Sequence, residues 1–223
     1  MTVCTKALFL SDINRHKLTI LRDDGLYRHI CMARPGSGYE SFDIITWPGY
    51  LCYTGDMGTY VFTRIADMFD FFRPDSRTPL RILDGIDRRY WAEKVEGSDK
   101  HDGVTEFDSE KFILEVKRRR VELIRERGRE LDKEQRRELW DGITDEVIDQ
   151  IERHQSESMA CHYVNEFQFI KSYSGYRPSP GDFFSLDTCE WPSCNSYTFR
   201  FTWRCFALRW AIAHYDIAKA FQK

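Results

Sequence analysis

The chain has 223 residues, of which 42% are hydrophobic and 15% aromatic. This is ample apolar material for a core, so disorder over most of the length is excluded. The formal net charge of −3 gives the whole protein no electrostatic bias toward nucleic acid or an anionic membrane, and no apolar run is long enough to span a bilayer.

The first third of the sequence predicts an antiparallel sheet. Asp23-Asp24-Gly25 is a hairpin signal between two β-prone runs, because Gly readily adopts positive φ angles. Further Gly-containing turns separate three more short runs. The β-prone runs are residues 17–22, 26–33, 42–47, 50–53 and 59–62. Short strands joined by close turns pair in sequence order, so we expect a meander with helices covering one face.

Helical periodicity begins directly after the sheet. Ile65, Met68, Phe69 and Phe72 form one apolar stripe and predict a helix over residues 65–72. Residues 108–157 are strongly helical and charged. Their predicted signals are an N-cap at Ser109, a helix end at Gly128, a capping box at Asp132 and Gln135, and a new helix from Thr144.

The last third of the chain is richer in aromatic residues. We predict a helix over 159–171, a loop over 175–194, and a final segment over 197–221. The final segment could start as a strand at 197–203 and continue as a buried helix. Trp203 and Trp210 are expected to be largely buried in a core shared with the sheet.

These elements predict an α+β fold. It consists of an N-terminal antiparallel β-meander packed on helices, a charged helical insertion and a long aromatic C-terminal segment. We expect residues 1–86 to hold the sheet and its covering helix, residues 87–157 to form the charged lobe, and residues 158–223 to complete the core, as one domain overall.

The segment from Trp47 to Thr59 holds two Gly-containing turns around a short aromatic strand. These turns could contact a partner, since Gly allows close backbone approach and aromatic rings supply anchoring area. They could equally be ordinary hairpin turns whose aromatic rings face the core. The candidate partner-binding residues are Trp47, Tyr50, Tyr53, Gly55, Asp56, Met57 and Gly58.

A basic run, defined as Lys117, Arg118, Arg119 and Arg120, could contact phosphates. Glutamates lie at helical spacing around it, and residues 117–138 carry a net charge of only +4. Few aromatic residues are interleaved, so a base-stacking surface is not favoured. The pattern is more typical of a solvated helix than of a nucleic-acid site.

No signature of catalysis or metal binding is present. The sequence has no phosphate-binding loop, no nucleophile motif and no Cys or His spacing typical of zinc sites. Seven scattered cysteines are typical of a reducing compartment. We therefore expect no catalytic residue, metal or cofactor, and a cytoplasmic location.

Two segments, Ser41 to Phe72 and Tyr197 to Asp216, resemble a family of uncharacterised proteins encoded by tailed phages and prophages. The resemblance covers both ends of the chain, while the middle departs in composition. It implies an accessory phage protein that is made in the cytoplasm of a bacterial host and acts on a host system. It carries over no catalytic residues.

The leading hypothesis is a non-catalytic, phage-encoded binding protein. It would antagonise a bacterial defence system, as anti-CRISPR or related inhibitors do, by stoichiometric binding to a host defence protein or complex. One alternative is a small enzyme or sponge that acts on nucleic acid or a nucleotide signal. Another is a phage structural or accessory protein.

Overall fold

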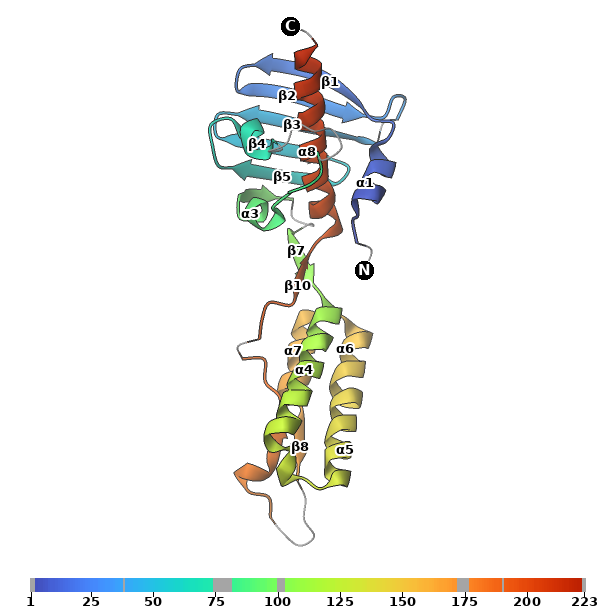
Figure 1. Cartoon of the computed structure of the whole chain (residues 1–223), viewed down its shortest axis with the longest axis vertical. Helices are drawn as coiled ribbons and strands as arrows, with labels where there is room; N and C mark the ends of the chain where they lie inside the picture. Colours follow the sequence, from blue (N-terminus) through green and yellow to red (C-terminus); the bar gives the residue numbers. More distant parts are fainter. Residues whose placement is uncertain are drawn as a thin grey trace. The chain divides into compact units, whose positions relative to one another are not determined.

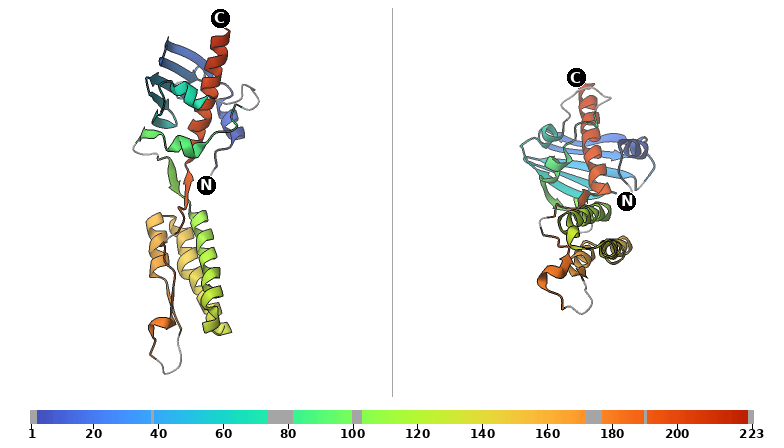
Figure 2. Two further views of the ribbon diagram at one scale, coloured as in Figure 1. Left: turned by 60° about the vertical axis from the view of Figure 1, so that its left-hand side comes forward. Right: turned by 60° about the horizontal axis from the view of Figure 1, so that its bottom comes forward.

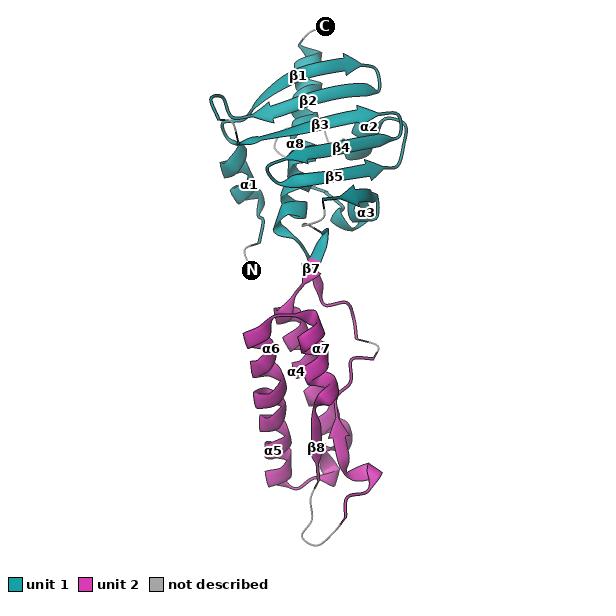
Figure 3. Cartoon of the chain, turned by 180° about the vertical axis from the view of Figure 1, so that it is seen from behind, with its two compact units in different colours: residues 1–105, 197–223 teal, residues 106–196 magenta. Residues whose placement is uncertain are grey.

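The computed structural model describes residues 3–37, 39–73, 82–99, 103–171, 177–189 and 191–221. The chain divides into two compact units (Figure 3). Unit 1 holds residues 1–105 and 197–223, and unit 2 holds residues 106–196. The fold is α+β, as predicted, with an antiparallel sheet packed on helices.

Unit 1 is built on a six-stranded sheet in the order β1-β2-β3-β4-β5-β6, with antiparallel neighbours throughout. Its strands are β1 (Lys17–Asp24), β2 (Tyr27–Ala33), β3 (Ser41–Trp47), β4 (Tyr50–Gly55), β5 (Gly58–Thr63) and β6 (Val95–Ser98). The predicted meander is confirmed. Strand β6 lies within residues 87–157, which the sequence assigned to the charged lobe. The sequence did not indicate it, because its pairing with β5 joins residues far apart in the chain.

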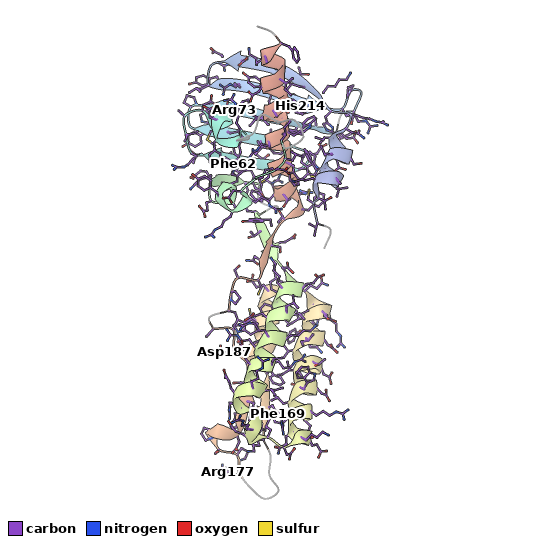
Figure 4. The ribbon with its side chains drawn as sticks, viewed as in Figure 1. Phe62, Arg73, Phe169, Arg177, Asp187 and His214 are labelled. Atoms are coloured by element: carbon purple, nitrogen blue, oxygen red, sulfur yellow. The ribbon has the colours of Figure 1, made fainter. Side chains whose placement is uncertain are left out.

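The helices of unit 1 are α1 (Lys6–Ile13), α2 (Met68–Phe72), α3 (Arg88–Ala92) and α8 (Phe199–Ala220). Helix α8 runs across one face of the sheet (Figures 1 and 2). Side chains such as that of Phe62 fill the layer between them (Figure 4). Trp203 is central to this core, since its ring centroid lies 5.1 Å from that of Phe9 and 5.7 Å from that of Phe42.

Two predictions about these helices need correction. The strand considered over residues 197–203 ends at Tyr197, because Thr198 accepts a hydrogen bond from Phe201 N (3.1 Å) and caps a helix that starts at Phe199. Helix α2 starts three residues later than expected, after the N-cap Asp67, and leaves Ile65 exposed. Trp203 is buried as predicted, whereas Trp210 is only partly buried.

Unit 2 is mainly helical. It contains α4 (Ser109–Arg127), a 3₁₀ turn (Gly128–Glu130), α5 (Lys133–Gly142), a π-helical segment (Ile143–Ile148), α6 (Asp149–His154) and α7 (Glu157–Glu166). Two short strands, β8 (Gln168–Ile170) and β9 (Phe183–Ser185), pair antiparallel, and a 3₁₀ turn (Pro180–Asp182) precedes β9. Strand β7 (Thr105–Phe107) pairs with β10 (Asn195–Tyr197), and the boundary between the units falls within both strands.

In unit 2, two of the predicted helix signals are confirmed and three differ from the structure. The helix end at Gly128 and the capping box of Asp132 and Gln135 are confirmed, but the N-cap of α4 is Asp108 and not Ser109. No helix break occurs at Thr144, because the π-helical segment carries α5 directly into α6. The helix predicted over 159–171 ends at Glu166 and gives way to β8.

The limits of the lobe also differ from the predicted 87–157. Helix α3 and strand β6 belong to unit 1, because Trp91 lies in its core and β6 extends its sheet. Helix α7 and strands β8 and β9 belong to unit 2, where Val164 and Phe184 are fully buried in a separate core. The predicted loop over 175–194 contains β9, while residues 175, 176 and 190 lie outside the described residues.

Candidate docking surface

The sheet of unit 1 has one face against α8 and one face that no described element of unit 1 covers (Figure 3). Alternation along the strands separates the two faces, as the burial of β3 shows: Phe42, Ile44 and Thr46 are buried, and the residues between them are not. We call the uncovered side the open face. Its positions on β2–β5 are Tyr27, His29, Cys31, Ala33, Ser41, Asp43, Ile45, Trp47, Tyr50, Cys52, Thr54, Thr59, Val61 and Thr63.

The composition of the open face on β2–β5 is unusual for this chain, and charged side chains lie beside it on the edge strand β1, at Lys17, Arg22 and Asp24. Charged residues make up 31% of the sequence, yet these positions include one carboxylate, Asp43, and neither lysine nor arginine. They include three aromatic side chains, of which Tyr27 and Tyr50 are well exposed. Depletion of charge together with enrichment of Trp and Tyr distinguishes the centre of a protein interface from ordinary surface.

Trp47 and Tyr50, two of the predicted partner-binding residues, lie on the open face. They are direct cross-strand neighbours, and their rings stack with centroids 5.4 Å apart and an interplanar angle of 15°. The remaining predicted aromatic residue, Tyr53, points the other way. It is fully buried and stacks on Phe42 at 5.3 Å, so it belongs to the core.

The two predicted turns do not form one surface. The Trp47–Tyr50 turn and the Gly55–Gly58 turn lie at opposite ends of β4. This strand has six residues, so the turns are separated by roughly 20 Å. The loop pair expected from the sequence is therefore two separate features, and only the first borders the exposed aromatic rings.

Residues of the Gly55–Gly58 turn have conformational roles. A Cβ atom at Gly55 would overlap Ser41 O and the Cα of Phe42. The Asp56 amide donates to Ser41 O (3.2 Å), and its carboxylate accepts from Ser41 N (3.2 Å). Met57 packs partly buried against the core. The reading as an ordinary hairpin turn thus accounts for these residues.

The centre of the open face carries a small polar cluster that the sequence analysis missed. His29 Nε2 and Asp43 Oδ1 are hydrogen-bonded at 2.8 Å, and Cys31 lies opposite Asp43 in the register. Burial, followed by the charge and hydrogen bond of Asp43, raises the pKa of the Cys31 thiol, and burial raises the pKa of Cys52. The apolar–polar–apolar order of Phe42, Asp43 and Ile44 could have placed Asp43 outward, but Ile45-Thr46-Trp47 reverses this pattern.

This cluster is poorly suited to nucleophilic catalysis. The thiolate is the reactive form of cysteine, and a raised pKa keeps the thiol protonated at neutral pH. Among the described residues, no group of three His, Cys, Asp or Glu side chains could hold a metal ion. What the cluster offers is a set of hydrogen-bonding groups at the centre of a largely uncharged surface.

The basic run on α4 is not an open row of four cations. Arg118 Nε donates to Glu115 at 2.8 Å, and Arg119 Nε donates to the same carboxylate at 3.2 Å. Arg120 is buried: its guanidinium carbon lies 3.5 Å from the centroid of the Trp140 ring, and Nη1 donates to Thr144 Oγ1 at 2.8 Å. Lys117 is exposed. The arrangement fits a helix held by its own ion pairs better than a phosphate-binding row.

Comparisons with known proteins place no further constraint on the site. No protein-family model matches the chain, and no match was found among curated proteins or solved structures. In the part of the chain that the structure describes, no helix has the length and apolar character needed to cross a membrane.

Proposed function

We propose that this chain is a non-catalytic binding protein that blocks a bacterial defence protein or complex by stoichiometric docking on the open face. The observation that carries the proposal is the composition of that face: strands β2–β5 present aromatic and uncharged side chains outward, with Asp43 as the single formal charge. Such a surface can bury apolar area against a partner without the cost of desolvating many charges.

The nature of the partner rests on two supporting arguments. A carboxylate at the centre of the face, with no lysine or arginine at the surrounding positions of β2–β5, repels phosphates, so a protein partner is favoured there over nucleic acid. The resemblance of both ends of the chain to phage-encoded proteins supports a partner inside a bacterial host. An inhibitor of this kind needs a shaped area with rigid anchors, and the stacked Trp47 and Tyr50 rings meet that need.

The test uses a charge placed at the middle of the face. Val61 lies between Cys52 and Gly97 in the register, and the absence of a side chain at Gly97 leaves space for a longer residue. We expect Val61→Arg to reduce inhibition at least about tenfold, or about 1.4 kcal/mol in binding, while the melting temperature is kept. Ser11→Arg, on the exposed side of α1, is the matched control and should remain fully active.

The assay is plaque formation of phage on hosts that carry individual defence systems, with and without this gene. For a system that is blocked, titration of its purified components should saturate near an equimolar ratio. Inhibition by trace amounts of the protein would show turnover and overturn the proposal. Full activity of Val61→Arg would move the docking surface away from the open face.

A further inference from the structure

Asp43 is the single carboxylate that strands β2–β5 place on the open face. Its side chain is 30% exposed, and its neighbours in the register are Cys31 on β2 and Thr54 on β4. Within the described residues, its ion-pair partner is His29, and no lysine or arginine lies within ion-pair distance. The arginine nearest in the register, Arg22 opposite His29, is held by Asp24 at 3.1 Å and lies over the Tyr27 ring.

A partner that covers the open face must compensate for the burial of the Asp43 carboxylate. A carboxylate has about four acceptor positions, and His29 and the Cys31 thiol satisfy only part of them. Water supplies the remaining hydrogen bonds while the face is free. Docking removes that water, and an anion buried without compensation costs far more than an apolar contact gains.

We propose, resting on the function proposed above, that the partner is a protein surface that places an arginine against Asp43 and apolar side chains against Ile45 and Trp47. Charge complementarity requires a cation at this point, because strands β2–β5 supply none and Arg22 of the edge strand β1 is already paired with Asp24. Arginine fits better than lysine, since its planar guanidinium binds a carboxylate through two parallel hydrogen bonds and is less strongly hydrated. The surrounding uncharged side chains would strengthen that pair by excluding water.

The probe is a displayed library of random dodecapeptides, selected on the immobilised full-length chain. We expect the selected peptides to be enriched in arginine with aliphatic or aromatic neighbours. In a selected peptide, replacement of the arginine by citrulline removes the charge and keeps the shape, and it should weaken binding about tenfold. The same replacement should have no effect on binding to Asp43→Asn, because the two changes remove the same interaction.

The outcomes separate the two proposals. Val61→Arg should abolish peptide binding and Ser11→Arg should leave it intact. Peptides that lose binding with Val61→Arg but tolerate citrulline would overturn the arginine inference and leave the docking face in place. Peptides indifferent to Val61→Arg, or failure to select any binder, would overturn both. The melting temperature of Asp43→Asn, which preserves side-chain volume, checks that the variant is folded.

Discussion

Gly58 is a residue whose role is set by a distant part of the chain. Its φ of +88° is unfavourable for other residues, and a Cβ atom there would overlap the Asp99 carboxylate and the Arg204 guanidinium. Arg204 is fully buried, with its guanidinium carbon 4.0 Å from the Tyr60 ring centroid and Nη2 4.0 Å from Asp99 Oδ2. The turn therefore approaches an ion pair between the buried Arg204 and the partly exposed Asp99.

Gly58→Ala should reveal this contact. Left-handed backbone costs a non-glycine residue about 1–2 kcal/mol. Gly49→Ala is the reference variant, because Gly49 has φ +85° and open space around its Cβ position, so only the backbone cost applies there. We expect Gly58→Ala to lower the free energy of unfolding by at least about 1 kcal/mol more than Gly49→Ala, since the fully buried Arg204 guanidinium must shift. Urea unfolding of both variants measures the difference. Equal losses would show that the ion pair yields freely.

At the scale of elements, adjacent arginines of the basic run on α4 have different structural roles. Arg118 and Arg119 face solvent and share Glu115, whereas Arg120 joins α4 to the continuous helix formed by α5 and the π-helical segment. It does so by stacking on Trp140 and donating to Thr144, whose hydroxyl donates in turn to Trp140 O. Arg120 therefore stabilises the packing of two helices.

The corresponding prediction compares two arginines of α4. A desolvated cation–π contact contributes about 1–2 kcal/mol and the hydrogen bond about 1 kcal/mol, so Arg120→Ala should destabilise unit 2 by about 2–3 kcal/mol. Arg125→Ala, at an exposed position of the same helix, should change stability little. Thermal unfolding followed by circular dichroism at 222 nm compares the two. Equivalent melting temperatures would show that the stacked arrangement contributes nothing net.

For unit 1 as a whole, ion pairs and hydrogen bonds to carboxylates connect α8 and α2 to the sheet and to each other. Lys219 and Tyr215 of α8 both reach Asp23 of β1 at 2.7 Å, Arg28 of β2 binds Asp67 before α2, and Arg73, labelled in Figure 4, binds Asp216 of α8. The Lys219 hydrogen bond lowers the pKa of Asp23. Burial acts to raise the pKa of Asp67, but the bonds and charge of Arg28 outweigh it, so the net shift is downward.

These shifts predict acid sensitivity. A carboxyl group with a lowered pKa in the folded state stabilises the fold above its unfolded pKa of about 4, and this contribution is lost as the pH falls through the folded value. We expect the free energy of unfolding to decrease below about pH 4 and the decrease to be shallower in Asp23→Asn. Asp24→Asn, at the exposed neighbouring position, is the matched control. Urea titrations between pH 7 and pH 2.5 test this, and an unchanged slope in Asp23→Asn would contradict it.

Much of the fold could be predicted from the sequence where the signals were local. The turn at Gly25 has the positive φ that the Asp23-Asp24-Gly25 motif indicated, and the β-prone run 42–47 forms strand β3. Gly128 and the Asp132 capping box marked helix ends correctly. Each of these features depends on side chains within a few residues of one another, so the chemistry of a short segment determines them.

The candidate site and the unit boundaries depended on tertiary structure. The sequence identified Trp47, Tyr50 and Tyr53 together, but only the placement of α8 on one side of the sheet separated the two rings of the open face from the buried ring of Tyr53. Likewise, β6 and the limits of unit 2 depend on pairing and packing between residues far apart in the chain. The composition of a segment determines which side chains gain free energy when they are buried. Which face is buried is decided by the element that packs against it, because the free energy of burial depends on contacts that no local segment contains.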